Sequence, residues 1–139
     1  MDGAGNWGEW AYGPEFVVGV HQETSSAITY TGTWTQQAVS SAYGGSLQYA
    51  NVQGAKAKTT FTGSSIAWIA PKDKKNGKAE VWIDGVKIAT LDLRSSSAQA
   101  RKVVFTQSWP SSGSHTLEVR VLGTPSRPRV DIDAFVILR

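Results

Sequence analysis

Short runs rich in Val, Ile, Thr and aromatic residues alternate along this chain with clusters of Gly, Ser, Asn and Pro. The change comes roughly every ten residues, a spacing that is typical of all-β sandwiches and barrels. No amphipathic helical run is longer than two turns, and Ser95–Ala100 is expected to hold at most one short helical turn. The expected strands are Phe16–Gln22, Ile28–Trp34, Ser46–Ala50, Ala55–Phe61, Ser65–Ala70, Ala79–Asp84, Val86–Leu93, Lys102–Gln107, His115–Leu122 and Val130–Leu138.

The clearest local signal is the dipeptide Asp84-Gly85 between two runs of alternating apolar residues. This dipeptide favours a tight two-residue hairpin, because both turn residues need positive φ. Residues that lie directly opposite each other in such a hairpin share a face of the sheet. The expected pairs are Ile83 with Val86, Trp82 with Lys87, and Val81 with Ile88. The apolar pairs should then face the core, and Trp82 should face outward together with Glu80 and Lys87.

The length of 139 residues, 40% of them hydrophobic, suits one domain with one hydrophobic core. No internal repeat or second domain is apparent. Residues 1–15 are rich in Gly and carry Trp7, Trp10 and Tyr12, so we expect an N-terminal arm or linker there and the sandwich over residues 16–139. The last expected strand, Val130–Leu138, begins with alternation and ends apolar on both faces, which predicts a central strand.

The net charge of +3 is a mild excess of basic residues. Lys72, Lys74, Lys75 and Lys78 crowd one stretch that is rich in turn residues. Such a cluster is consistent with a solvated loop or with attraction to an anionic polymer. The lysines are not interleaved with aromatic residues, as a platform for single-stranded nucleic acid requires, so no nucleic acid is expected as a partner.

The sequence carries no signal for catalysis or for membrane insertion. It has no cysteine, no nucleophile elbow, no phosphate-binding Gly loop and no zinc-spaced histidine cluster. Of the two histidines, His21 and His115, His115 stands at a strand start after a turn, a position that suits capping or packing. No apolar stretch approaches the ~20 residues of a membrane helix, and the first residues lack the pattern of a signal peptide. We therefore expect a non-enzyme, a fragment of a longer exported protein.

Several motifs follow one another in an order that is typical of one fold family. They are Tyr30–Trp34, Tyr43–Ser46, Gly54-Ala55 leading to Phe61–Gly63, Ala79–Gly85, Gly113–Leu117 and Val130–Phe135. Over residues 16–139 this order resembles the galactose-binding-like jelly-roll modules of bacterial extracellular enzymes and surface proteins. It is similar to the family 6 and family 35 carbohydrate-binding modules. The resemblance implies an all-β, two-sheet antiparallel β-sandwich without catalytic machinery, located outside the cell or at its surface.

The resemblance also implies a structural calcium ion in many members. In the family pattern, a carboxylate near the end of the first strand and an Asp on the last strand reach the metal together. Glu23, with Asp133 or Asp131, falls at those places here. The usual paired acids of the first strand are replaced by His21-Gln22-Glu23, and calcium needs several oxygen ligands. The alternative is that Asp131 and Asp133 are hydrogen-bonded or paired with Arg127 or Arg129.

Two places could hold a ligand of this family, an oligo- or polysaccharide. Sugar rings stack on exposed indole and phenol rings while polar side chains bind the hydroxyl groups. The candidates in the loops at one end of the sandwich are Tyr43, Asn51, Asn76 and Arg127, and the candidates on the sheet face are Trp82, Glu80 and Lys87. The loops are favoured, since loops on a rigid scaffold usually carry recognition. Lys87 is also placed to lie across Trp82 as a cation–π pair.

Two functions remain open from the sequence. One is a non-catalytic carbohydrate-binding module that targets a larger exported protein to glycan. The other is a structural or adhesive spacer of a bacterial surface protein with no sugar site. A spacer should bury its tryptophans and show no groove, whereas a binding module needs an accessible site. Of the strand tryptophans, Trp34 and Trp68 are expected in the core and Trp109 as a plug beneath a loop.

Overall fold

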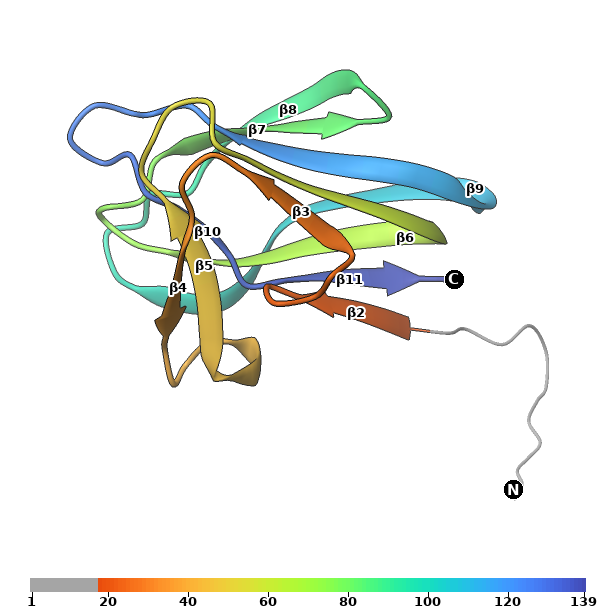
Figure 1. Cartoon of the computed structure of the whole chain (residues 1–139), viewed down its shortest axis with the longest axis horizontal. Coiled ribbons are helices and arrows are strands. Elements are labelled where there is room, and N and C mark those ends of the chain that lie inside the picture. The colour runs from red at the N-terminus through yellow and green to blue at the C-terminus, as the bar shows by residue number, and fades with distance from the viewer. Residues whose placement is uncertain (1–17) are drawn as a thin grey trace.

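A computed structural model describes residues 18–139 and shows two antiparallel sheets packed as a sandwich (Figure 1). The elements are β2 (Val18–Gln22), β3 (Ile28–Thr31), β4 (Thr35–Ala38), the 3₁₀ turn η1 (Tyr43–Gly45), β5 (Ser46–Ala50), β6 (Lys56–Lys72), β7 (Lys78–Ile83), β8 (Val86–Asp92), β9 (Gln99–Val121), β10 (Val130–Ile132) and β11 (Ala134–Leu138). The larger sheet has the order β2-β11-β6-β9-β7-β8, with β3 also paired to β6, and the smaller sheet has the order β10-β5-β4. The predicted all-β, two-sheet antiparallel fold is confirmed.

The core lies between the two sheets and is built from alternate residues of their strands. Its largest fully buried side chains are Trp68 and Phe135, on neighbouring strands of the larger sheet. Trp34 and Trp109 are partly buried and pack against this core. The prediction for Trp68 is therefore confirmed, while Trp34 lies at the edge of the core.

The two long strands β6 and β9 replace four shorter strands that were expected from the sequence. Their register runs continuously to Gly63 opposite Gly113 and resumes with Ser65 opposite Ser108. The residues between Ser108 and Gly113, which look like a turn in the sequence, form an irregularity within one ladder instead. The same break changes which residues are buried along β6, from Phe61 before it to Ile66 after it. Both halves of the strand thus direct apolar side chains into the core.

The hairpin of β7 and β8 forms at Asp84-Gly85, and both residues have positive φ, 50° and 81°. Ile83 pairs with Val86 and Trp82 with Lys87 as predicted, but Val81 pairs with Ala89 because the register shifts. The predicted inward direction of Val86 and Ile88 is wrong, since their exposed fractions are 60% and 47%. The physical reason is that β8 is the last strand of its sheet, where side chains are less covered by the described residues than they are on the central strands.

The expected last strand is divided at Asp133 into two strands that belong to different sheets. β10 pairs with β5 in the smaller sheet, and β11 lies between β2 and β6 in the larger one. Asp133 therefore marks the point where the chain passes from one sheet to the other. The central position predicted for this region is confirmed by β11.

The structure differs from the sequence-based expectations at β4 and at Ser95–Ala100, and it does not describe residues 1–15. β4 was not predicted, because its sequence Thr-Gln-Gln-Ala is polar and all four residues are exposed. The short helical turn that the sequence allows over Ser95–Ala100 does not form, since this segment contains bends and the start of β9. The arm of residues 1–15, with Trp7, Trp10 and Tyr12, lies outside the described residues, so the domain boundary stays a prediction.

Candidate functional site

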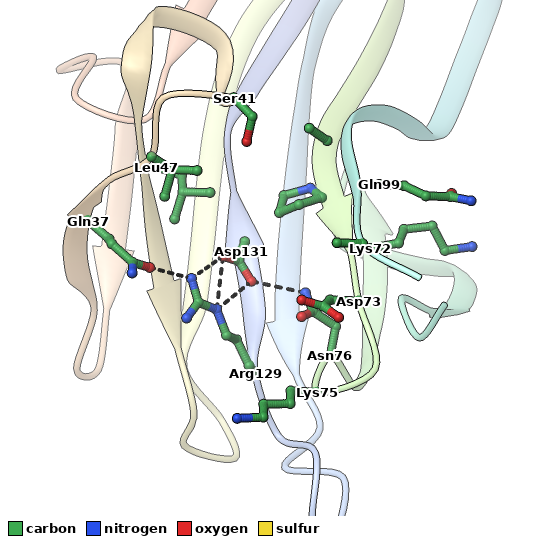
Figure 2. A pocket seen from close by; sticks show the side chains of 14 residues that line it. Gln37, Ser41, Leu47, Lys72, Asp73, Lys75, Asn76, Gln99, Arg129 and Asp131 are labelled. Atoms are coloured by element: carbon green, nitrogen blue, oxygen red, sulfur yellow. Dashed lines mark hydrogen bonds and ion pairs between the residues drawn. The ribbon is translucent and has the colours of Figure 1, made fainter. Parts of the chain in front are cut away.

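An ion pair between the partly buried Arg129 and the buried Asp131 organises one end of the sandwich (Figure 2). Asp131 lies on β10 and is 1% exposed. The Nε of Arg129 donates to both carboxylate oxygens at 3.0 Å, and Nη2 donates to Oδ2 at 2.7 Å. The guanidinium also lies 4.0 Å from the centre of the Tyr49 ring on β5, a cation–π contact. These contacts fix the guanidinium in one orientation.

Two amide side chains extend this pair in opposite directions. Asn76, which is 3% exposed, donates from Nδ2 to Asp131 Oδ1 at 3.0 Å. Gln37, on β4, accepts from Arg129 Nη2 through Oε1 at 2.6 Å. Figure 2 shows Gln37 and Asn76 on the two sides of the Arg129–Asp131 pair. The network therefore joins the smaller sheet to the loop between β6 and β7.

A pocket of about 290 Å³ opens over this network. Its walls come from β4, β5 and the segment before η1 on one side, and from the end of β6, the following loop and the start of β9 on the other. The polar side chains that line it are Gln37, Ser41, Lys72, Asp73, Lys75, Asn76, Gln99, Arg129 and Asp131. Its volume lies near the lower end of the ~300–1,000 Å³ range of ligand pockets, which suits a small group or the end of a chain.

The electrostatics of the pocket are set by the buried pair. Burial raises the pKa of Asp131, while the hydrogen bonds and charge of Arg129 oppose that shift. Burial alone would lower the pKa of Arg129, but the hydrogen bonds and charge of Asp131 more than offset it, so this pKa is raised. Arg129 is therefore a permanent cation at the floor of the pocket.

The structure separates the residues that were predicted as a loop-end site. Asn76 lines the pocket, whereas Tyr43, Asn51 and Arg127 are not among its lining residues. Arg127 binds the carboxylate of Asp92 at 2.6 and 3.2 Å and the backbone carbonyl of Asn76 at 3.0 Å. Tyr43 is 38% exposed and Asn51 is also exposed. Their roles as ligand contacts stay predictions.

The predicted sheet-face residues do lie together on the outer side of β7 and β8. Trp82 Nε1 donates to Glu80 Oε1 at 3.0 Å, and Lys87 Nζ lies 3.3 Å from Glu80 Oε2. The expected cation–π partner of Trp82 is wrong: Arg120 covers the ring at 3.7 Å, because it stands on the neighbouring strand β9, while Lys87 turns to Glu80. The hydrogen bond from Trp82, together with Lys87, lowers the pKa of Glu80. A hollow of only about 60 Å³ lies beside Trp82.

His115 has the packing role that the sequence suggests. Its ring stacks on Trp109 with 3.7 Å between centroids and 7° between planes. Its Nδ1 lies 2.7 Å from Asp84 Oδ2 at the hairpin turn. The contacts of His115 are thus those of a residue that ties β9 to the β7–β8 turn.

Glu23 and Asp133, two of the predicted calcium ligands, lie beside each other in the interior. Their exposed fractions are 1% and 0%. The backbone N–H of Glu23 donates to the carbonyl of Asp133 at 3.2 Å, and the N–H of Tyr43 donates to Asp133 Oδ2 at 3.0 Å. The hydroxyl of Ser46 donates to Glu23 Oε2. Burial and, secondarily, the charge of Glu23 raise the pKa of Asp133 to about 6.

The chemistry of this acid pair fits a hard cation. Glu23 Oε1 and Asp133 Oδ1 are buried and have no hydrogen-bond partner in residues 18–139. Calcium takes several oxygen ligands, including backbone carbonyls, so two such oxygens are a partial set. No group of three or more His, Cys, Asp or Glu that could hold a metal is found in the described part of the chain. Asp131 is engaged elsewhere, with Arg129 and Asn76.

Sequence reasoning anticipated part of the pocket and missed the rest. The pairing of Asp131 with Arg129 was one of the alternatives, and alternate residues of a strand share a face. Gln37, Lys72 and Gln99 were not singled out as pocket residues. They come from three separate elements, β4, β6 and β9, and no local pattern marks them.

The sequence matches parts of two large enzymes, and no family model matches it. It is 30% identical over 142 residues to an A type blood N-acetyl-alpha-D-galactosamine deacetylase of Flavonifractor plautii, covering 96% of this chain and 18% of the enzyme. It is 31% identical over 120 residues to an A type blood alpha-D-galactosamine galactosaminidase of the same organism, covering 86% of this chain and 11% of the enzyme. The chain thus spans less than a fifth of these curated relatives.

One solved structure matches almost from end to end. It is the CBM36-1 domain of a multidomain xylanase from the hindgut metagenome of Trinervitermes trinervoides, with a TM-score of 0.57 and 15% sequence identity. The match covers 87% of this chain and 96% of that domain. The fold of this chain is similar to that of the CBM36-1 domain. This likeness to a whole domain, together with the partial matches to carbohydrate-active enzymes, shows that the chain corresponds to a module of larger proteins. Among residues 18–139, no helix has the length and hydropathy to cross a membrane.

Proposed function

We propose that this chain is a non-catalytic carbohydrate-binding module that holds a larger exported protein on a glycan, outside the cell or at its surface. The observation that carries the proposal is the pocket over Arg129 and Asp131. An oriented guanidinium and a buried amide beneath a cavity of about 290 Å³ form a polar site on a rigid scaffold. A few fixed polar groups in a pocket are what sugar recognition requires.

The likeness to a whole carbohydrate-binding domain supports the same proposal. The enzymes matched at 30% and 31% identity act, by their names, on galactosamine-containing glycans, and the chain corresponds to a small part of each. A module within such an enzyme raises the local concentration of the catalytic domain near its polymer, because binding makes the encounter intramolecular.

One observation favours the alternative, a structural or adhesive spacer. The described tryptophans are engaged within the fold: Trp68 is buried, Trp82 is covered by Arg120, and Trp109 stacks on His115. A spacer would have no use for a polar pocket, however, so the two functions are separated by whether this pocket binds sugar.

The test is a glycan array with the 139-residue chain, followed by calorimetry with the best ligand. Gln37→Ala removes an amide that lines the pocket, and Gln36→Ala is its matched control, since the neighbouring residue of β4 points to the opposite side. We expect Gln37→Ala to weaken binding and Gln36→Ala to leave it unchanged. A blank array with a folded protein would support the spacer. Equal binding by both variants would exclude the pocket.

We further propose that Glu23 and Asp133 hold a structural calcium ion. The two unpartnered oxygens of this buried pair support it, because uncompensated buried carboxylates are costly unless they are paired or coordinate a metal. When bound, the ion would neutralise both charges where β2, β11 and the segment around η1 meet.

A further inference from the structure

Around Arg129, the acceptors of Asp131 and Gln37 are engaged, whereas donors of Arg129 and Gln37 stay free. Both oxygens of Asp131 and the Oε1 of Gln37 already accept hydrogen bonds. In the described part of the chain, Arg129 Nη1 has no hydrogen-bond partner. Because Gln37 Oε1 faces Arg129, its Nε2 donor is directed away from it. From Asp131, Gln37 and Arg129 a ligand therefore meets mainly donors, and its groups that match these three side chains must be acceptors.

Two lysines add charge to the same walls. Lys72 and Lys75 line the pocket, and neither forms an ion pair with a carboxylate of residues 18–139. The lining contains three cations, Lys72, Lys75 and Arg129, and two carboxylates, Asp73 and Asp131. Because Arg129 neutralises Asp131, the balance above the floor is two ammonium groups against Asp73.

Stacking cannot supply the affinity of this pocket from its own walls. None of the 14 residues that line it, all within the described chain, carries an aromatic ring. Besides contacts with apolar lining residues such as Leu47 and Pro71, the recognition energy comes from hydrogen bonds, and those between charged partners are the strongest. A neutral sugar would leave the ammonium groups of Lys72 and Lys75 without a charged partner.

From these observations we infer that the pocket selects sugars that carry an anionic group, a carboxylate or a sulfate, and this inference rests on the proposed glycan-binding function. The anionic group lies between Lys75 and the free Nη1 side of Arg129. Figure 2 shows Lys75 below Arg129, and it shows the side chains of Lys72 and Gln99 on the other wall, extending away from Arg129. Asp73 is the group that opposes the anion, so its charge limits the affinity.

The experiment compares three trisaccharides of one linkage by calorimetry with the whole chain: galactotriose, trigalacturonate, and galactotriose sulfated at the same carbon. We expect one or both anionic sugars to bind at least about tenfold tighter than the neutral one, as expected for hydrogen bonds to charged groups. The preference should fall as salt is raised from 50 to 500 mM, since the lysines are partly exposed and screened. The two anionic arms show which group is preferred.

Three charge variants test the site itself. Lys75→Gln should weaken binding of the anionic sugar by about tenfold. Asp73→Asn should tighten binding of the anionic sugar, because it removes the opposing charge. For a neutral sugar, the same change should weaken binding or leave it unchanged. Lys56→Gln is the matched control for Lys75→Gln, because it removes the same charge outside the pocket. Lys56 is the first residue of β6, whereas the pocket lies at the other end of this strand, at Lys72. Melting curves of each variant show that the fold is retained.

The outcomes separate this inference from the function on which it rests. If galactotriose binds as tightly as the anionic sugars and Asp73→Asn does not tighten any of them, the charge selectivity is overturned and the glycan-binding function stands. The same holds if the array identifies a neutral glycan whose binding Lys75→Gln leaves unchanged. If no sugar of the array or of this set binds, both fail together.

Discussion

The guanidinium of Arg120 lies 3.7 Å from the centre of the Trp82 ring, so protein already covers one face of this outward indole. The indole N–H is engaged as well, because it donates to Glu80. A sugar that stacked on that face would have to displace Arg120, which also pairs with Glu118. The most promising aromatic residue of the sheet face is thus occupied within the protein, and the pocket over Arg129 becomes the better candidate.

Removing Arg120 should uncover Trp82. We expect Arg120→Ala to increase the quenching of tryptophan fluorescence by acrylamide and to lower stability by about 1 kcal/mol, the scale of a partly exposed cation–π contact. The increase should vanish in Arg120→Ala/Trp82→Phe, which assigns it to this ring. Arg94→Ala, which removes an exposed arginine from a loop, is the control and should change neither quantity. Unchanged quenching in Arg120→Ala would contradict the contact.

The hairpin turn should contribute stability that depends on pH. The hydrogen bond from His115 lowers the pKa of Asp84; burial acts against it and the N–H of Thr116 acts with it. A carboxyl whose pKa is lowered on folding stabilises the protein above its unfolded pKa of about 3.9 and loses this contribution as the pH falls through the lower folded value.

This contribution can be isolated with Asp84→Asn, since asparagine tolerates the positive φ of 50° at this position. The free energy of unfolding, measured in urea, should be lower for the variant at pH 6, and the gap should close as the pH falls from about 4 to 2. In a His115→Asn background, the pH-dependent part of the gap should shrink. A gap that is constant over this range would show that Asp84 acts through the turn geometry alone.

Alternation predicted the sandwich because most strands bury one face. It failed where that physical basis is absent: β4 is polar on all sides, so only its pairing with β5 defines it. It also divided β6 and β9 into separate strands. Gly63 and the Trp109–Gly113 segment have the composition of turns, and only the partner strand makes them one irregular ladder.

The site was less predictable than the fold for a related reason. Arg129 directly precedes β10 and Asp131 lies on β10 two residues further along, so their pairing is a local property. Asn76 was singled out as a polar loop residue, and the structure places it in the pocket. Lys75 was noted only as part of a charged cluster. The remaining walls are brought together by the pairing of distant strands, which no short sequence window contains.

Calcium should stabilise the protein through Glu23 and Asp133. A ligand that binds only the folded state adds about 2.7 kcal/mol at a hundred times its Kd, so millimolar calcium should raise the melting temperature over the same sample in EDTA. Glu23→Gln and Asp133→Asn should each abolish that difference. Asp131→Asn should retain it, because Asp131 binds Arg129 and Asn76 instead. A calcium response that survives both of the first two variants would place the ion elsewhere.

Gly77 should be a position at which any side chain damages both the fold and the pocket. A Cβ there would lie 2.2 Å from the carbonyl oxygen of Arg127, which is backbone and cannot swing away. The N–H of Gly77 also donates to the carbonyl of Arg129 at 2.9 Å, so this close approach positions the residue at the pocket floor. Gly77→Ala should therefore cost about 1–3 kcal/mol, the scale of overpacking.

The matched control for Gly77→Ala is Gly19→Ala on β2. A Cβ at Gly19 meets nothing closer than Arg139 Nη2 at 3.8 Å, an ordinary contact with a flexible side chain. Urea unfolding should therefore separate the two variants, with Gly19→Ala close to the parent protein. Calorimetry with the best glycan should show weaker binding only for Gly77→Ala, because only this change pushes the Arg127–Arg129 segment away from β7. Equal stability of the two variants would mean that the backbone at Arg127 shifts to accommodate the new Cβ. The segment beneath the pocket would then be more mobile than its hydrogen bonds indicate.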